Sequence, residues 1–148
     1  MSNSDREIVE YTIDRYEDVM NLMAEIPGVS IRSADSLDAT QRYLARNPGL
    51  SFLALREGKV IGCAMCGHDG RRGYLQHVVV AVPYRRQGIG NALVERCLRE
   101  LARLGIAKAH LDVFVTNDEA NRYWTNRGWQ KREDIHRYSL IRGTDDNA

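Results

Sequence analysis

The sequence contains little cysteine, no long apolar run and almost no net charge. Its 148 residues include 3 cysteines and carry a formal net charge of +1. A small, odd number of cysteines disfavours a disulfide-built secreted domain, and the polar start Met1–Glu7 shows no apolar signal core, so we expect a cytoplasmic protein. No apolar run is long enough to predict a membrane-spanning helix. The balanced charge, without basic residues interleaved with aromatics, predicts neither nucleic acid nor a membrane as a partner.

The rest of the composition is that of an ordinary globular protein. Hydrophobic residues make up 43% of the chain and charged residues 28%. A chain of this length and composition buries a substantial core. We therefore expect a single domain over residues 1–148, with a few frayed residues at the N-terminus and a frayed tail over residues 143–148.

Cys63 and Cys66 form a CxxC pair, a spacing that occurs in metal and redox sites. The residues on both sides of this pair have the character of a strand, in which positions three apart point to opposite faces. Two thiols on opposite faces do not converge on one ion. The pattern therefore favours packed core cysteines, and no metal site is expected.

Two common phosphate-binding loops are also missing. A Walker loop requires Gly-Lys-Ser/Thr, and no such triplet follows Gly88 or Gly90. The dinucleotide-binding fingerprint would require a third glycine where Leu93 stands.

A different phosphate-binding arrangement is present between residues 74 and 91. A Val-rich strand over Tyr74–Val82 leads through a short basic turn with Gly88 into an amphipathic helix that begins at Ile89. The first backbone N–H groups of a helix lack partners and carry partial positive charge, so a glycine-containing entry lets a phosphate approach them closely. We expect a pyrophosphate to bind the amides between Arg86 and Asn91.

The segment Arg85-Arg86-Gln87-Gly88-Ile89-Gly90 resembles the Arg/Gln-x-x-Gly-x-Gly/Ala signature of the GNAT superfamily of acyl-CoA N-acetyltransferases. The order of elements around it, from Phe52 to Leu140, is similar to that of the ribosomal-protein-alanine-acetyltransferase-like subgroup. The resemblance implies an α/β (α+β) fold with a mixed, mostly antiparallel central sheet of about six to seven strands flanked by about four helices.

The local pattern predicts the elements of such a fold. Strands are expected at Glu7–Ile13, in a hairpin of Leu50–Leu55 and Val60–Cys66, at Tyr74–Val82, at Lys108–Val115 and twice within Trp129–Ile141. Helices are expected from Asp14 to Pro27, from Ser36 to Asn47, from Ile89 to Gly105 and from Asp118 to Arg127.

The resemblance also implies an acetyl-CoA site. In the family, pantetheine binds the backbone of the fourth strand, which here is Val79, Val80 and Ala81, and an Asn eleven residues before the last Gly-aromatic pair contacts the cofactor, which here is Asn117. Trp124 would pack against the same end of the cofactor. The remaining residues implied in cofactor binding form the signature loop and helix start: Arg85, Arg86, Gln87, Gly88, Ile89, Gly90 and Asn91.

The acid and base of the reaction are less well defined. The family's usual Tyr acid falls on Trp124, whose indole N–H is no proton donor of useful pKa, so the neighbouring Tyr123 is the candidate acid, with a core or cofactor-packing ring as the alternative. The base is Asp112 or His77, with Asp112 slightly ahead; an Asp bonded to backbone and a half-buried structural His are the alternatives. Asp69 and Arg71–Arg72 either shape the acceptor mouth or form a solvated turn.

The function that this pattern indicates is an N-acetyltransferase. It would transfer an acetyl group from acetyl-CoA to a primary amine of a small molecule or peptide, by direct attack in a ternary complex. The alternative is a non-catalytic acyl-CoA-binding module, which the missing Tyr favours slightly. The acceptor is not specified by the sequence, which also leaves a homodimer open.

Overall fold

The structure is a computed structural model that describes residues 6–148. The chain divides into two units, one ending at His110 and one beginning at Leu111, and each is described by itself. The expected fraying at the N-terminus concerns residues outside the described part of the chain.

The first unit is built on a five-stranded sheet with the order β1-β2-β3-β4-β5. Neighbouring strands are antiparallel except for β4 and β5, which are parallel. The fold class is therefore the expected mixed, mostly antiparallel sheet, with five strands where six to seven were predicted. The strands are β1 (Glu7–Glu10), β2 (Phe52–Arg56), β3 (Lys59–His68), β4 (Gly73–Val80) and β5 (Ala109–His110).

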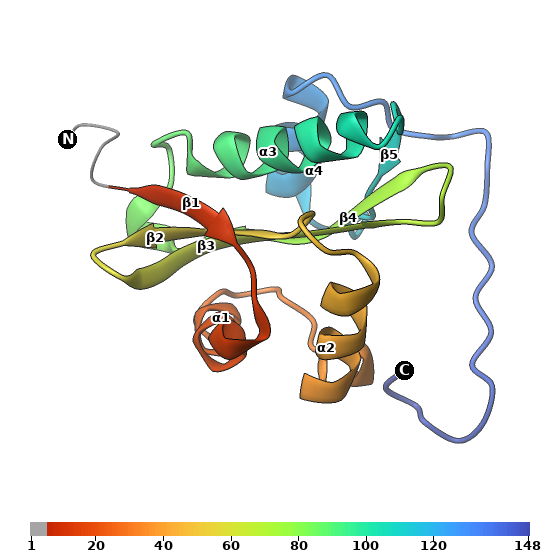
Figure 1. Cartoon of the computed structure of the whole chain (residues 1–148). Helices are drawn as coiled ribbons and strands as arrows, with labels where there is room; N and C mark the ends of the chain where they lie inside the picture. The colour runs from red at the N-terminus through yellow and green to blue at the C-terminus, as the bar shows by residue number, and fades with distance from the viewer. Residues whose placement is uncertain (1–5) are drawn as a thin grey trace. The chain divides into compact units, whose positions relative to one another are not determined.

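Helices cover both faces of this sheet, with α1 and α2 on one face and α3 on the other (Figure 1). As predicted, the second helix starts at Ser36, which is the N-cap of α2: its Oγ accepts a hydrogen bond from Ala39 N at 3.2 Å. The helices of this unit are α1 (Tyr16–Ala24), α2 (Leu37–Arg46) and α3 (Ile89–Arg103), with short 3-10 turns η2 (Ile13–Arg15), η3 (Ser33–Asp35) and η4 (Val82–Tyr84).

The core lies on both faces of the sheet because β3 is buried along almost its whole length. On the α3 face, Gly62 admits Leu93 and Ile89 so closely that a Cβ there would lie 3.1 and 3.3 Å from their side chains. On the opposite face, the apolar side of α1 packs on the sheet. The buried residues of the hydrophobic cluster on this face are Tyr11, Val19, Leu22, Met23, Ile26, Leu53, Leu55, Val60, Cys63 and Met65.

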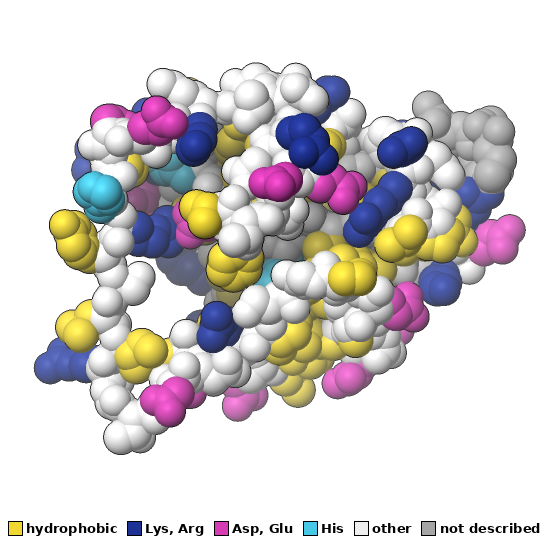
Figure 2. Space-filling view, turned by 180° about the vertical axis from the view of Figure 1, so that it is seen from behind, with side chains coloured by type: hydrophobic (Ala, Val, Ile, Leu, Met, Phe, Trp, Pro, Cys, Tyr) yellow, Lys and Arg dark blue, Asp and Glu magenta, His cyan; other side chains and the backbone are white. Residues whose placement is uncertain are grey.

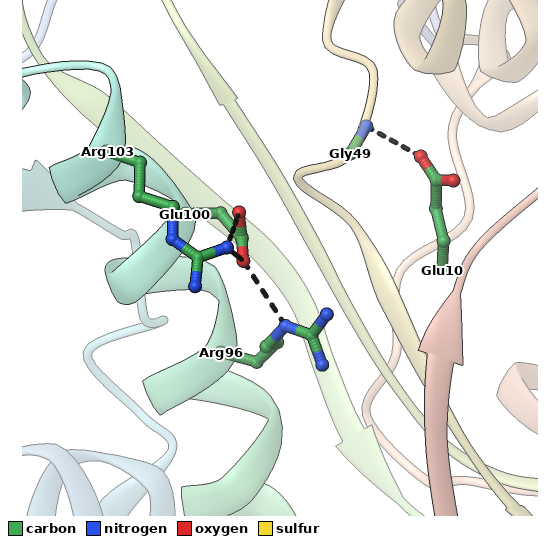
Figure 3. A network of polar contacts seen from close by, with 5 residues as sticks. All are labelled: Glu10, Gly49, Arg96, Glu100 and Arg103. Atoms are coloured by element: carbon green, nitrogen blue, oxygen red, sulfur yellow. Dashed lines mark hydrogen bonds and ion pairs between the residues drawn. The ribbon is translucent and has the colours of Figure 1, made fainter.

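Polar contacts on the surface of this unit act both between elements and within α3 (Figure 3). Glu10, at the end of β1, accepts a hydrogen bond from Gly49 N at 2.7 Å and so holds the turn between α2 and β2. On the surface of α3, Glu100 bridges Arg96 at 3.4 Å and Arg103 at 2.6 Å. Pairs of this kind at i,i+3 and i,i+4 support a helix by a few tenths of a kcal/mol each, about 0.2–0.5.

The second unit contains one helix, α4 (Asp118–Asn126), which Asn117 caps by accepting from Ala120 N at 3.1 Å. The two strands expected within residues 129–141 are absent, and the strand expected at 108–115 is reduced to β5. A strand needs a hydrogen-bonded partner and a buried face. The segment after α4 has no buried face, because Ile135 and Tyr138, which would lie on opposite faces of a strand, are 56% and 91% exposed. Figure 2 shows its apolar side chains standing apart from one another.

Candidate active site

Strand β4 is interrupted by a bulge at His77 and Val78. The register with β3 passes from Cys63–Val79 to Met65–Gln76, so β4 contains one more residue than β3 between these pairs. His77 has a φ of +51°, a left-handed conformation that costs a non-glycine residue free energy. Such bulges redirect a side chain and release a backbone group from the ladder, and here the redirected side chain is the imidazole of His77.

The His77 imidazole is paired with Asp35, at the end of η3. Nε2 of His77 lies 2.7 Å from Oδ1 of Asp35, and the two side chains are only 16% and 12% exposed. The other carboxylate oxygen, Oδ2, accepts from Arg32 N at 2.8 Å. Because an ionised carboxylate only accepts hydrogen bonds, Nε2 is the nitrogen that donates in this pair, and in the neutral imidazole the lone pair is then on Nδ1.

Further contacts fix Asp35 in place. The hydroxyl of Tyr16 in α1 donates to the carbonyl of Asp35 at 2.6 Å. Asp35 as a whole residue is only 9% exposed, which is unusual for an aspartate. Its hydrogen-bond partners compensate the cost of burying the carboxylate. Asp35 is a site residue that the sequence analysis missed, because 42 residues separate it from His77 and no spacing connects them.

Beyond the bulge, β4 has an open edge. Its pairing with β5 consists, in the described part of the chain, of Gly73–Ala109 and Tyr74–His110. Val79 and Val80 face Cys63 and Gly62 of β3 on the other edge, and Ala81 N bonds to the Ile61 carbonyl. Among residues 6–148, no strand covers the other edge of residues 79–81, but the Val80 carbonyl accepts from Arg85 Nε at 3.1 Å and the Ala81 carbonyl accepts from Tyr84 N at 2.9 Å. An extended ligand bound through the backbone there would replace the Arg85 contact.

The loop that follows β4 has the geometry of an anion cradle. Gly88 has a φ of +78° and lies at the N-cap of α3, and Ala92 N donates to its carbonyl at 3.0 Å. The amides of Ile89 and Gly90 precede Ala92, in the first turn, where a helix has no acceptor for its N–H groups. Arg86 also has a positive φ of 64°. A pyrophosphate fits this exposed, N–H-rich turn.

Side-chain hydrogen bonds join the loop that carries the cradle to neighbouring segments. The Arg85 side chain folds back and donates through Nε to the Val80 carbonyl at 3.1 Å. Arg6 donates to the Gln87 carbonyl at 2.8 Å. Asn91 lies in the first turn of α3. The loop is therefore joined to β4 and to the chain before β1.

A cleft of about 470 Å³ opens on the first unit near the β3–β4 hairpin. The C-terminal end of α2 supplies one wall, and five residues of the hairpin supply another: His68, Asp69, Arg72, Gly73 and Tyr74. Asp69 and Arg72, which the sequence analysis connected with the acceptor mouth, both line it, whereas Arg71 does not take part. Gln76, the residue before His77, lines it too.

The candidates of the second unit are held by neighbours within that unit. Asp112 pairs with Arg137 at 2.7 Å, and both side chains are more than half exposed. Burial raises the pKa of the Tyr123 phenol, and Arg127 lowers it in part, so Tyr123 keeps its proton at neutral pH. Trp124 makes edge-to-face contacts with Tyr123 and Trp129, with ring centroids 5.0 and 5.1 Å apart.

The three cysteines are buried and free, as expected for core residues. Cys63 belongs to the cluster beneath α1, and burial raises the pKa of its thiol to about 12. The thiol of Cys97 in α3 has a raised pKa because it is hydrogen-bonded to Cys66 and buried. Cys63 and Cys66 thus point to opposite faces of β3. Over residues 6–148, no three His, Cys, Asp or Glu side chains gather as metal ligands would, and no helix is long and apolar enough to span a bilayer.

The chain matches known proteins over most of its length. A family model described as the acetyltransferase (GNAT) family matches residues 16–129. The acetyltransferase plu1384 of Photorhabdus laumondii is 33% identical over 91% of this chain and 92% of its own, and the N-alpha-acetyltransferase MAK3 of Arabidopsis thaliana is 26% identical over 89% and 72%. The chain spans about half the length (55%) of a further relative, the acetyltransferase ECA0875 of Pectobacterium atrosepticum.

A solved structure shares the fold. The PaiA N-acetyltransferase of Thermoplasma acidophilum, in complex with coenzyme A, superposes with a TM-score of 0.78 at 17% sequence identity. The superposition covers 91% of this chain and 94% of that one. At this level of identity the likeness concerns the fold.

Proposed function

The chain belongs to the acetyltransferase (GNAT) family, and from that premise we propose that it transfers an acetyl group from acetyl-CoA to the primary amine of a peptide or small molecule by direct attack in a ternary complex. Acetyl-CoA supplies the acetyl group as an activated thioester. The alternative kept from the sequence is an acyl-CoA-binding module without turnover.

One observation supports the proposal: strand β4 and the loop after it contain, in order along the chain, three features that such a reaction would use. The bulge at His77 and Val78 comes first, the open edge of Val79–Ala81 follows, and the cradle at Gly88 comes last. An extended pantetheine along residues 79–81 would connect a thioester near the bulge with a pyrophosphate at the start of α3. A backbone N–H freed at the bulge is suited to polarise the thioester carbonyl.

We assign the role of general base to His77, ahead of Asp112. Asp35 holds the imidazole so that Nδ1 has the free lone pair, and Nδ1 takes a proton from the acceptor ammonium. The amine nitrogen then forms a bond to the acetyl carbon while the carbon–sulfur bond breaks; the nitrogen loses a second proton to give the amide, and the leaving thiolate gains one. Asp112 ranks second because its carboxylate is exposed and paired with Arg137.

The other sequence-derived roles stay proposals. Tyr123, which keeps its proton, is the candidate donor to the thiolate. Asn117 uses its side chain to cap α4, so any contact with the cofactor would be made beside that hydrogen bond. Trp124 offers ring surface.

Turnover of acetyl-CoA, followed by the release of free thiol, tests the proposed function. A panel of amino acid amides, short peptides and small polyamines should contain at least one acceptor that raises thiol release well above hydrolysis. Mass spectrometry of the product should show a gain of one acetyl group on nitrogen. Tight CoA binding by calorimetry without transfer to any member of a broad panel would favour the binding module instead.

A further inference from the structure

We propose that Arg6 is a positioning residue for the phosphate cradle: its hydrogen bond to the Gln87 carbonyl holds the Gly88 N–H in the direction of the bound pyrophosphate. The inference rests on the proposed function, because it concerns the binding of acetyl-CoA. Arg6 lies 81 residues before Gln87, so it is far from the signature in the chain. In space, the chain enters β1 beside the loop that leads into α3 (Figure 1).

The contact joins a guanidinium to a backbone carbonyl. Nη1 of Arg6 lies 2.8 Å from the Gln87 carbonyl oxygen. A charged donor makes such a hydrogen bond stronger than one between two neutral groups. Arg6 is half-buried, so water competes for the contact only in part. The bond is therefore strong enough to favour one conformation of the loop over another.

The Gln87–Gly88 peptide connects this bond to the cradle. The peptide is trans, so the Gln87 carbonyl and the Gly88 N–H point in opposite directions. Gly88 has left-handed backbone angles and Ile89 is helical, a succession that directs neighbouring N–H groups into one anion-binding concavity. With the carbonyl held toward Arg6, the Gly88 N–H is the first donor of this concavity, and those of Ile89 and Gly90 follow.

Gly88 does not fix the direction of this peptide by itself. Glycine adopts positive and negative φ with similar ease, so a rotation of the Gln87–Gly88 peptide that changes the sign of φ at Gly88 is sterically allowed. The surroundings are open as well, because no heavy atom of the described residues lies within 4 Å of an ideal Cβ at Gly88. After such a rotation, the Gln87 carbonyl would point into the cradle, where its partial negative charge would repel a phosphate.

The residue before Gln87 also requires support. Arg86 has a φ of +64°, which costs a non-glycine residue free energy, and such a conformation persists where surrounding contacts hold it. Arg85 ties the start of the loop back to β4. Arg6 acts further along, on the carbonyl that lies between the two left-handed residues Arg86 and Gly88. Its bond is thus placed where the loop is most strained.

The experiment compares CoA with pantetheine, which lacks the pyrophosphate. In Arg6→Met, the calorimetric affinity for CoA should fall by about tenfold, because the loop conformation that binds phosphate is less populated and the apparent affinity falls by the same fraction. The affinity for pantetheine, measured by NMR titration, should equal that of the wild-type protein. Both measurements use the full chain.

Two further variants make the result specific. Arg6→Lys keeps a cationic donor and should recover part of the affinity for CoA. Arg15→Met is the matched control, because Nη1 of Arg15 also donates to a turn carbonyl, that of Gly58, at 3.3 Å. That turn is not part of the cradle, so Arg15→Met should bind CoA as the wild-type protein does. A general loss of positive charge would instead weaken binding in both Met variants.

The salt dependence distinguishes positioning from a direct contact with phosphate. Arg6 bonds the side of the peptide that faces away from the concavity, so the loss of affinity in Arg6→Met should be the same at low and high ionic strength. An ion pair between Arg6 and a phosphate would be screened by salt. A loss that disappears at high salt would therefore overturn the positioning role.

The outcomes separate this inference from the proposed function. Equal affinity for CoA in the wild-type protein and Arg6→Met would overturn the inference alone, as would an equal loss for CoA and pantetheine, which would mean a general effect on the fold. If Arg6→Met did not fold, Arg6→Lys would replace it, with a smaller loss expected for CoA and none for pantetheine. Failure to acetylate any amine would overturn the proposed enzyme and leave these binding measurements valid.

Discussion

The residues up to His110 and those from Leu111 onward are ordered by different forces. In the first unit, apolar side chains such as Val19, Leu53 and Leu93 are completely buried between helices and sheet. In the second unit, large apolar side chains such as Val115 and Leu140 are 88% and 89% exposed. Its order comes instead from contacts between near neighbours, such as the Asn117 cap and the edge-to-face ring contacts of Trp124.

This difference indicates where the chemistry is best defined. The His77–Asp35 pair and the β4 bulge are fixed by a close-packed core, which permits little movement. Asp112 and Tyr123 are placed by an exposed ion pair and by a local ring contact, which contribute little each. We therefore expect the residues of the first unit to control the rate and those of the second unit to adjust it.

The largest expected effect is that of His77→Gln. Loss of a general base should lower kcat by about 100-fold or more, while the affinity for CoA stays unchanged. The ascending limb of the pH profile of kcat/KM should lose the contribution of the enzyme, leaving that of the acceptor amine. The measurement is steady-state turnover across pH with one acceptor.

Two comparisons make the His77 result specific. His136→Gln, at an exposed histidine of the second unit, should retain wild-type rates. Asp35→Asn should lower kcat less than His77→Gln, and Asp35→Glu should restore part of the loss, because the carboxylate that orients the imidazole is kept. Wild-type rates in His77→Gln at every pH, with a large loss in Asp112→Asn, would reverse the assignment of the base.

The next effect is on stability and compares the two units directly. Leu53→Ala, at a completely buried position of β2, should lower the free energy of unfolding by about 2–5 kcal/mol through lost burial and a cavity. Leu140→Ala, at a position that is 89% exposed, should change it by less than about 0.5 kcal/mol. Chemical denaturation measures the free energy of unfolding of both variants. Similar losses in the two variants would mean that Leu140 is buried in solution.

A smaller, local effect is expected at the cradle. Gly88→Val places a β-branched residue at a φ of +78°, which strains the turn and should displace the amides that face the phosphate. Affinity for CoA should fall by at least tenfold in calorimetry. Gly58→Val is the matched control, because Gly58 has the same φ of +78° and equal open space in the β2–β3 turn. Equal affinity in both variants would contradict the assignment of the cradle.

The smallest effect is expected at Trp124. If the indole supplies ring surface rather than a proton, Trp124→Phe should keep most of the turnover, within about threefold, and Trp124→Tyr should equal or exceed it. Thiol release with a fixed acceptor measures both. A collapse of activity in Trp124→Phe, with folding and CoA affinity intact, would show that the indole takes part in the chemistry.

Local sequence patterns predicted most of the first unit correctly. The Ser36 cap, the hairpin of β2 and β3 and the apolar repeat of α3 each depend on residues close to one another in the chain. The prediction of strands within residues 129–141 was wrong, because a strand depends on residues that are distant in the chain. Whether such a segment forms a strand depends on an available partner strand, which no local pattern specifies.

The sequence by itself determined the family signature, the helix that begins at Ile89 and the left-handed turn at Gly88. Each of these depends on a few adjacent residues. Only the tertiary structure decided that His77 lies on a bulge, that Asp35 reaches it, and that Tyr43 of α2 packs on Gly67 of β3. These arrangements follow from strand register and from the packing of η3 and α2 on the sheet. They join residues tens of positions apart, and a periodic pattern in the chain reports which face a residue takes but not which distant residue meets it there.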